Sequence, residues 1–210
     1  MFNRTVPKSR SLTSNSILVT GKIGAGKSIV TQIFRTLGWP VFSADKEARH
    51  IMVTDLDVKN KIIHILGKDA YLPDGELNKP FIAEQIFGND DKKTKMNAIV
   101  HPEVGKYFLK WKGKHKHPFV VREAALPYTE YTSLKPDITI LVDADTAIRK
   151  KRVISRDKKQ PEQFDKINES QPKEDIYSKY ADFIIYNNPR DKVLGQFLIT
   201  INTIKRRSLG

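Results

Sequence analysis

One eight-residue motif constrains the fold of this chain more than any other feature of its sequence. Residues 21–28 read Gly-Lys-Ile-Gly-Ala-Gly-Lys-Ser and match the pattern G-x-x-x-x-G-K-[ST]. The motif follows an apolar run and precedes an amphipathic stretch, the strand–loop–helix setting in which this pattern holds phosphate. Its glycines let backbone N–H groups point inward around phosphate oxygens, and the helix N-terminus adds positive charge. The motif therefore predicts a P-loop, the binding site of a nucleoside triphosphate.

The same motif assigns individual roles. Lys27 is placed to reach the β- and γ-phosphates, and the Ser28 hydroxyl is placed to ligate Mg²⁺. ATP and Mg²⁺ are therefore the expected cofactors. We expect the nucleotide to contact the loop and the first residues of the helix, namely Gly21, Gly24, Ala25, Gly26, Lys27, Ser28 and Ile29.

Beyond the motif, short apolar runs alternate with segments of helical periodicity, a pattern typical of βαβ units around a parallel sheet. A length of 210 residues suits one domain with insertions. We predict a three-layer α/β fold of the P-loop NTPase type with a five-stranded parallel sheet. The expected strands are residues 17–20, 41–43, 119–122, 138–142 and 183–186.

Two segments are too long to be simple crossovers between these strands. Residues 56–117 contain several amphipathic stretches and predict a helical insertion. Residues 146–180 are dense in charged and amide side chains, so we expect a poorly packed lid that moves. The nucleotide-binding core would then comprise residues 17–55, 118–145 and 181–210, preceded by a flexible basic tail at residues 1–16.

The charge of the chain indicates anionic ligands. The sequence has 37 Lys and Arg against 24 Asp and Glu, a formal net charge of +13, so nucleic acid, acidic lipid and phosphorylated small molecules all qualify. Basic residues surround Trp111 in residues 110–116, which keeps a nucleic-acid-binding protein open as an alternative. The absence of cysteine excludes disulfides and thiolate catalysis.

A carboxylate follows the second expected strand. Asp45 would lie at the carboxyl edge of a parallel sheet, where ligands bind in such folds. A carboxylate there can accept the proton of an attacking hydroxyl. An Asp directly after a strand is equally often the N-cap of a helix, so its position alone leaves both roles open.

The order of further motifs gives the chain a family resemblance. Ala44-Asp45 with Ala48-Arg49 follows the P-loop, His101-Pro102 lies in the helical insertion, and Arg152 and Arg156 lie in the lid. This order resembles that of the dephospho-CoA kinases, over residues 17–198 or nearly the whole chain. The resemblance implies ATP-dependent phosphorylation of the ribose 3′-hydroxyl of dephospho-CoA to give coenzyme A, the last step of its biosynthesis. It also implies that the helical insertion holds this coenzyme precursor.

Site roles follow from the resemblance position by position. Asp45 would be the base that takes the 3′-hydroxyl proton. Arg49, Lys79 and His101 would contact the acceptor, and Asn187 would lie at the adenine. Arg152 and Arg156 lie four residues apart and so share a helix face, from which they would stabilise charge on the triphosphate. A P-loop kinase for another small hydroxyl acceptor, a nucleoside or nucleotide, remains the alternative enzyme.

The chain departs from the family pattern at several positions. Ser43 stands where an Asp is usual, and Lys79 where an Arg is more usual. The acidic residue expected after the third strand could be Glu123, Glu130 or neither. A non-catalytic relative is therefore a further alternative. We expect a cytoplasmic monomer or small homo-oligomer with no nucleic-acid or membrane partner.

Overall fold

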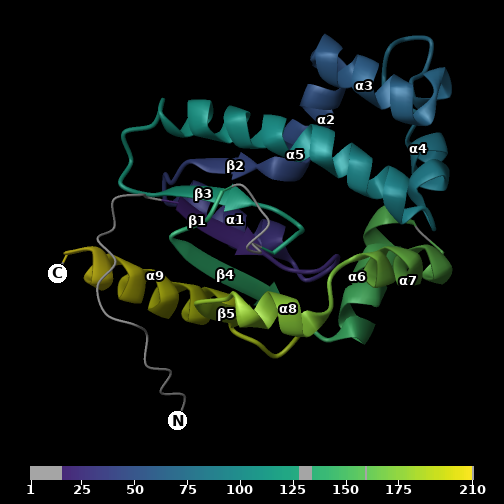
Figure 1. Cartoon of the computed structure of the whole chain (residues 1–210). Helices are drawn as coiled ribbons and strands as arrows, with labels where there is room; N and C mark the ends of the chain where they lie inside the picture. The colour runs from purple at the N-terminus through teal and green to yellow at the C-terminus, as the bar shows by residue number, and fades with distance from the viewer. Residues whose placement is uncertain (1–15, 128–133, 159, 210) are drawn as a thin grey trace.

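Five parallel strands form the centre of the molecule in the order β2-β3-β1-β4-β5 (Figure 1). The structure is a computed structural model that describes residues 16–127, 134–158 and 160–209. Strand β1 is buried along its whole length and β4 along all but its last residue, because helices cover both faces of the sheet. The predicted five-stranded parallel sheet is thereby confirmed. Its strands are β1 (Ser16–Thr20), β2 (Val41–Ser43), β3 (Val120–Glu123), β4 (Ile138–Asp143) and β5 (Phe183–Tyr186).

Two helices cover one face of the sheet. They are α1 (Lys27–Thr36), which follows the P-loop motif, and the C-terminal α9 (Val193–Leu209). Phe34 of α1 and Phe197 of α9 meet edge to face with ring centroids 4.8 Å apart, and both are fully buried. This aromatic contact joins both helices to the main apolar core, so the P-loop is attached to a rigid layer.

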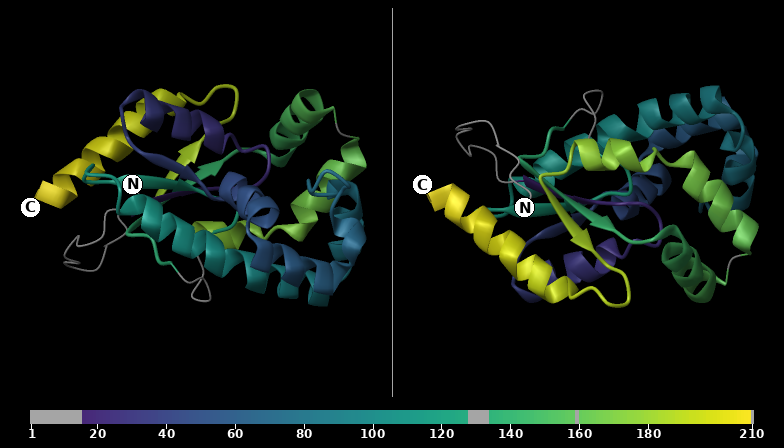
Figure 2. Two further views of the ribbon diagram at one scale, coloured as in Figure 1. Left: turned by 90° about the horizontal axis from the view of Figure 1, so that it is seen from above. Right: turned by 90° about the horizontal axis from the view of Figure 1, so that it is seen from below.

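The other face carries a long helix, α5 (Asp90–Lys112), whose Phe108 packs on Phe42 and Val120 of the sheet. Together with α5, a group of shorter elements encloses a second apolar cluster. Figure 2 shows this helical part beside the sheet and beyond its carboxyl edge. Its elements are α2 (Ala44–Thr54), α3 (Leu56–Leu66), the short 3₁₀ helix η1 (Lys68–Ala70) and α4 (Lys79–Ile86).

The segment expected to be a poorly packed lid consists of α6 (Thr146–Asp157), α7 (Pro161–Ser170) and α8 (Glu174–Lys179). The expectation of poor packing is wrong, because each helix buries a large side chain: Val153, Phe164 and Tyr177. The segment also touches the helical part, since Lys93 of α5 donates a hydrogen bond to the Ser170 carbonyl at 3.1 Å.

The basic tail predicted at residues 1–16 lies outside the described residues except for Ser16, which is buried and begins β1, so the tail prediction is wrong at that residue; Glu130 also lies outside them. Among the described helices, none is both long and apolar enough to cross a membrane.

Candidate active site

The loop between β1 and α1 has the backbone conformation that its glycines allow. Gly24 has a φ of 80°, and a Cβ atom there would lie 2.5 Å from the carbonyl oxygen of Arg149. Gly26 has a φ of 99°, and a Cβ atom there would collide with the side chain of Asn187. Both positions therefore need glycine for conformation and for space. The loop curls tightly enough to direct N–H groups at a phosphate.

Lys27 lies inside this loop at the first residue of α1. Its Nζ donates a hydrogen bond to the Gly21 carbonyl at 2.7 Å. Burial lowers the pKa of Lys27, and the nearby carboxylates of Asp45 and Glu123 oppose that shift. Two carboxylates, one from the end of β3 and one from the start of α2, therefore act electrostatically on the phosphate-binding lysine.

Asp45 lies in the first turn of α2, directly after β2. The N-cap of that helix is Ser43, so the structure does not use Asp45 as the cap. Asp45 is exposed and lines a cavity of about 710 Å³ between the carboxyl edge of the sheet and helices α2 and α5. His101 of α5 and Arg122 of β3 line the same cavity. The cavity is large enough for part of a nucleotide-like acceptor.

Glu123 ends β3 and lies opposite Ser43 in the sheet register. Its carboxylate accepts a hydrogen bond from the Thr31 hydroxyl of α1 at 3.2 Å. Glu123 is therefore the acidic residue at the carboxyl edge next to the P-loop, one of the alternatives that the sequence left open.

The residues present fit Mg²⁺. Ser28, the second residue of α1, is exposed, and the Glu123 carboxylate accepts a hydrogen bond from Thr31 of the same helix. Within residues 16–127, 134–158 and 160–209 no group of three or more Asp, Glu, His or Cys side chains is arranged for a metal. This sparse oxygen set suits an ion that takes most of its ligands from nucleotide phosphates and water.

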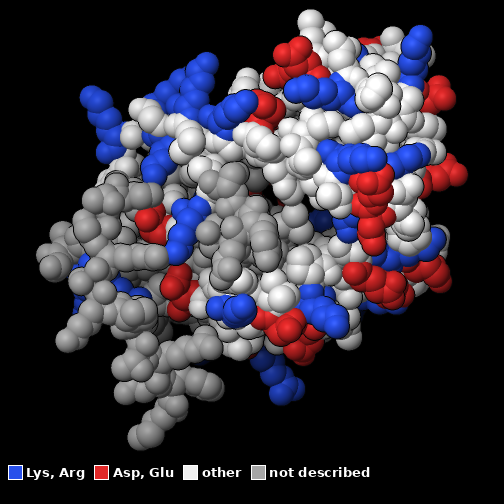
Figure 3. Space-filling view, viewed as in Figure 1, with Lys and Arg blue, Asp and Glu red and all other residues white. Residues whose placement is uncertain are grey.

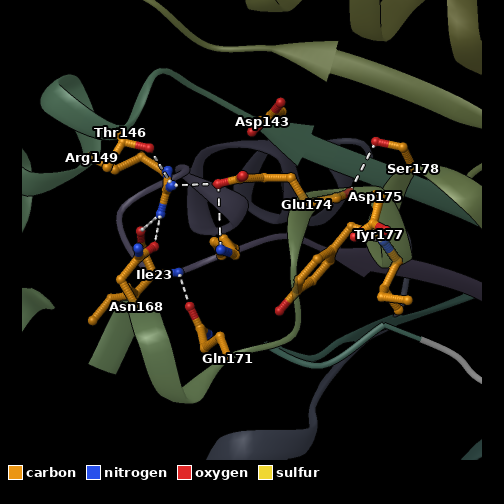
Figure 4. A network of polar contacts seen from close by, with 12 residues as sticks. Ile23, Asp143, Thr146, Arg149, Asn168, Gln171, Glu174, Asp175, Tyr177 and Ser178 are labelled. Atoms are coloured by element: carbon orange, nitrogen blue, oxygen red, sulfur yellow. Dashed lines mark hydrogen bonds and ion pairs between the residues drawn. The ribbon is translucent and has the colours of Figure 1, made fainter. Parts of the chain in front are cut away.

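A polar network joins the lid to the P-loop (Figure 4). Arg149 of α6 is only 1% exposed, and its guanidinium donates to the Asn168 side chain at 2.7 Å and to Glu174 at 3.1 Å. The Gln171 side chain accepts a hydrogen bond from the Ile23 N–H of the loop at 2.9 Å. Helices α7 and α8, and the turn between them, therefore contact either the P-loop or Arg149 of α6.

The two lid arginines expected at the triphosphate have different surroundings. Arg152 donates from Nη2 to the Asn187 carbonyl at 2.7 Å, while its Nη1 is buried without a hydrogen-bond partner among the described residues. Arg156 is largely exposed and pairs with Asp157 at 2.6 Å. Arg156 also helps to lower the pKa of Lys27, after the larger effect of burial, so its charge lies within reach of the loop.

Asn187 lies at the end of β5 and donates a hydrogen bond to the Ala25 carbonyl of the P-loop at 2.8 Å. It is thus beside the nucleotide loop, where the resemblance put the adenine. Arg49 and Lys79 are exposed, and neither lines the 710 Å³ cavity. Their contacts with the acceptor stay predictions.

Sequence reasoning gave no role to Arg149 or Glu174. Helix α6 contains several basic residues, and nothing in the sequence around Arg149 distinguishes it from those that face solvent. Its burial could therefore not be predicted. Gln171 likewise had no assigned role.

The basic run at residues 110–116 lies at and beyond the end of α5. Its aromatic residue, Trp111, packs on Phe42 with ring centroids 5.3 Å apart and on His115 at 4.3 Å. Trp111 is thereby half-buried in the packing between α5 and the sheet. On the face in Figure 3, basic side chains over the helical part and the lid are interspersed with acidic ones.

The pKa of His101 provides a test of its proximity to Asp45. Desolvation lowers the pKa of His101, and the negative charge of Asp45 partly opposes this. We expect Asp45→Asn to lower the pKa of His101 further, because the charge that favours imidazolium is removed. An NMR titration of the histidine ring protons, assigned with His101→Gln, measures this. A pKa that rises or stays the same in Asp45→Asn would contradict the proximity.

The sheet order, the glycine loop with Lys27, and the acceptor cavity beside it define a P-loop kinase. A family model described as dephospho-CoA kinase matches residues 16–192. The chain belongs to the dephospho-CoA kinase family.

Individual relatives agree with this membership. A dephospho-CoA kinase of Porphyromonas gingivalis is 31% identical over 193 residues, which covers 91% of this chain and 95% of the relative. The dephospho-CoA kinase of Salinibacter ruber is 33% identical and covers 90% of this chain and 92% of its own length.

Solved structures share the fold. A protein from Thermus thermophilus has a TM-score of 0.76 at 23% identity, covering 93% of this chain and 98% of that chain. A dephospho-CoA kinase from Campylobacter jejuni has a TM-score of 0.62 at 24% identity, covering 91% and 98%. At these identities the structures support the fold alone.

Proposed function

We propose that this chain transfers the γ-phosphoryl group of ATP to the ribose 3′-hydroxyl of dephospho-CoA and that Asp45 and Lys27 carry the reaction. Family membership supplies the activity. The observation that carries the residue roles is that Asp45 lines the acceptor cavity and also acts electrostatically on Lys27. One carboxylate thus borders both the phosphate-binding loop and the space for the acceptor.

The loop would hold the triphosphate through its N–H groups, with the Lys27 ammonium at the β- and γ-phosphates. The 3′-hydroxyl oxygen attacks the γ-phosphorus, its proton passes to the Asp45 carboxylate, and the bond to the bridging oxygen of ADP breaks. Most of the rate enhancement in such a transfer comes from positioning and charge stabilisation. When bound, Mg²⁺ neutralises charge on the β- and γ-phosphates, with Ser28 and Glu123 as the residues suited to hold it.

Lid residues would complete the charge stabilisation. Arg156 is exposed and close enough to affect Lys27, so it can turn toward a bound triphosphate after leaving Asp157. Arg152 is bonded to Asn187 and would act at the nucleoside end of ATP. These roles are proposals for both arginines.

Asp45→Asn tests the role of the base. We expect kcat to fall about 100-fold, a modest loss because the transition state relies little on proton removal. The KM for ATP should change little, because Asp45 lies outside the P-loop. The assay follows ADP release with Mg-ATP, with and without dephospho-CoA, and confirms by mass a product one phosphate heavier.

Asp57→Asn is a matched control, because Asp57 is an exposed carboxylate in the first turn of α3 and does not line the cavity. Its kcat should equal that of the wild type. Wild-type kcat in Asp45→Asn would refute the base assignment while leaving the activity intact. No product from the wild-type protein would instead point to another hydroxyl acceptor, which a panel of nucleosides and nucleotides would identify.

A further inference from the structure

Arg122 occupies an unusual place for an arginine. It lies within β3, between its partners Leu18 of β1 and Phe42 of β2 in the sheet register. Its guanidinium lies over the ring of Phe108, 5.3 Å from the centroid, so the side chain extends to the face covered by α5. A central strand normally holds apolar residues at such a position. The cationic side chain therefore calls for a functional explanation.

The described residues leave this cation largely unsatisfied. A guanidinium has five N–H donors, and the contact present is from Nη2 to the Leu134 carbonyl at 3.0 Å. None of the ion pairs formed among the described residues includes Arg122. Burial lowers the pKa of Arg122, which means that the fold makes its positive charge less favourable and offers no compensating carboxylate.

The unpaired donors face the acceptor cavity. Arg122 lines the 710 Å³ cavity together with Asp45 and His101. The other walls are mainly apolar, formed by residues such as Met52, Val104 and Leu134. An anion entering this cavity would therefore meet a guanidinium that pairs with no carboxylate of the described residues.

We infer that Arg122 binds the diphosphate of the acceptor and thereby selects a nucleoside diphosphate ester over an uncharged nucleoside. This inference rests on the proposed function. Dephospho-CoA carries its diphosphate on the same ribose whose 3′-hydroxyl reacts, so the anion enters the cavity that Asp45 borders. A planar guanidinium can bind two phosphate oxygens at once, which fixes the orientation of the phosphate in addition to balancing its charge. Arg122 thus acts as a substrate-binding and specificity-determining residue on the acceptor side.

Arg122→Gln tests the inference through its separate effects on the KM for dephospho-CoA and the KM for ATP. We expect the KM for dephospho-CoA to rise about 10- to 100-fold, the loss typical of one charge-assisted contact, while the KM for ATP stays within about twofold. Arg122→Lys keeps the positive charge but not the planar pair of donors, so its KM for dephospho-CoA should lie between those of the wild type and Arg122→Gln. Lys110→Gln is the matched control, since it removes an exposed positive charge from α5 outside the cavity and should leave both constants unchanged.

A binding measurement separates this inference from the proposed function. Calorimetric titration of ADP-saturated protein with dephospho-CoA should give an affinity about 10- to 100-fold weaker for Arg122→Gln than for wild type, whether or not turnover occurs. Equal affinities, or a KM for ATP that rises as much as the KM for dephospho-CoA, would overturn the role of Arg122. Dephospho-CoA that binds the wild type normally without giving product would instead count against the proposed function.

Discussion

Replacing Lys27 with alanine is expected to reduce kcat/KM for phosphoryl transfer by about 1,000-fold, the largest catalytic effect of any single change in the chain. Lys27 belongs to the phosphate-binding motif and lies close enough to Asp45 and Glu123 for both carboxylates to act on its pKa. Its ammonium is held at the Gly21 carbonyl, 2.7 Å away, so it is positioned before the nucleotide arrives. Positive charge that is already in place stabilises the migrating phosphoryl group without reorganisation.

Lys22→Ala is the matched control for this experiment. Lys22 belongs to the same loop, but its amino group pairs with Glu174 of the lid at 3.3 Å. We expect its kcat/KM to stay within about tenfold of the wild type, because its charge is already directed at a carboxylate. The assay is ADP release at saturating dephospho-CoA with varied ATP. A Lys27→Ala protein that keeps more than a tenth of wild-type kcat/KM would refute the role of this lysine.

The parts of the fold that follow local rules were predictable. The strands β2 and β5 have the predicted ends, because each is a short apolar run with clear breaks on both sides. The P-loop was predictable because the conformation of Gly24 and Gly26 excludes other residues, which leaves a spacing that can be recognised in the sequence.

Helical faces were predicted less well. In the sequence, Leu194, Phe197, Leu198 and Ile201 recur at the spacing of a single helix face. The structure buries Phe197 and Ile201 fully or nearly so, but leaves Leu194 at 56% and Leu198 at 47% exposure. Periodicity identifies the apolar side of a helix, but the width of the buried face depends on how many neighbours pack against it. Here α1 and the sheet cover only part of the stripe of α9.

Long-range polar contacts could not be predicted at all. Arg122 and Glu123 are adjacent in β3, yet one side chain lies in the acceptor cavity and the other contacts α1, because successive residues of a strand face opposite sides. The sequence shows that adjacent strand residues face opposite sides, but it does not show which helices or cavities lie on each side of β3. The lid shows the same limit, because its charge content suggested loose packing while Arg149 and Phe164 are buried.

Arg149→Met is expected to lower the free energy of unfolding by about 3 kcal/mol, the largest stability effect predicted for one side chain. Methionine keeps the aliphatic stem and removes the guanidinium. Acceptors on three sides then lose their donor: the Asn168 side chain, the Thr146 hydroxyl and the Ala144 carbonyl. The side chain of Glu174 is 62% exposed and Thr146 is also exposed, so both can turn to water, and the cost comes mainly from the buried Ala144 carbonyl and the half-buried Asn168 side chain.

Lys150→Met on the same helix separates this cost from a general effect of charge removal. Lys150 pairs with Asp165 at 2.6 Å, but the two side chains are 33% and 47% exposed, so the loss should stay below about 1 kcal/mol. Denaturant unfolding measures both variants, and the midpoint of thermal unfolding should fall by about 6–12 °C for Arg149→Met. Equal losses for the two variants would show that the Arg149 network does not hold the lid against the P-loop. A selective loss for Arg149→Met would mean that the lid and the loop unfold as one unit, so nucleotide binding at the loop should also stabilise α6 to α8.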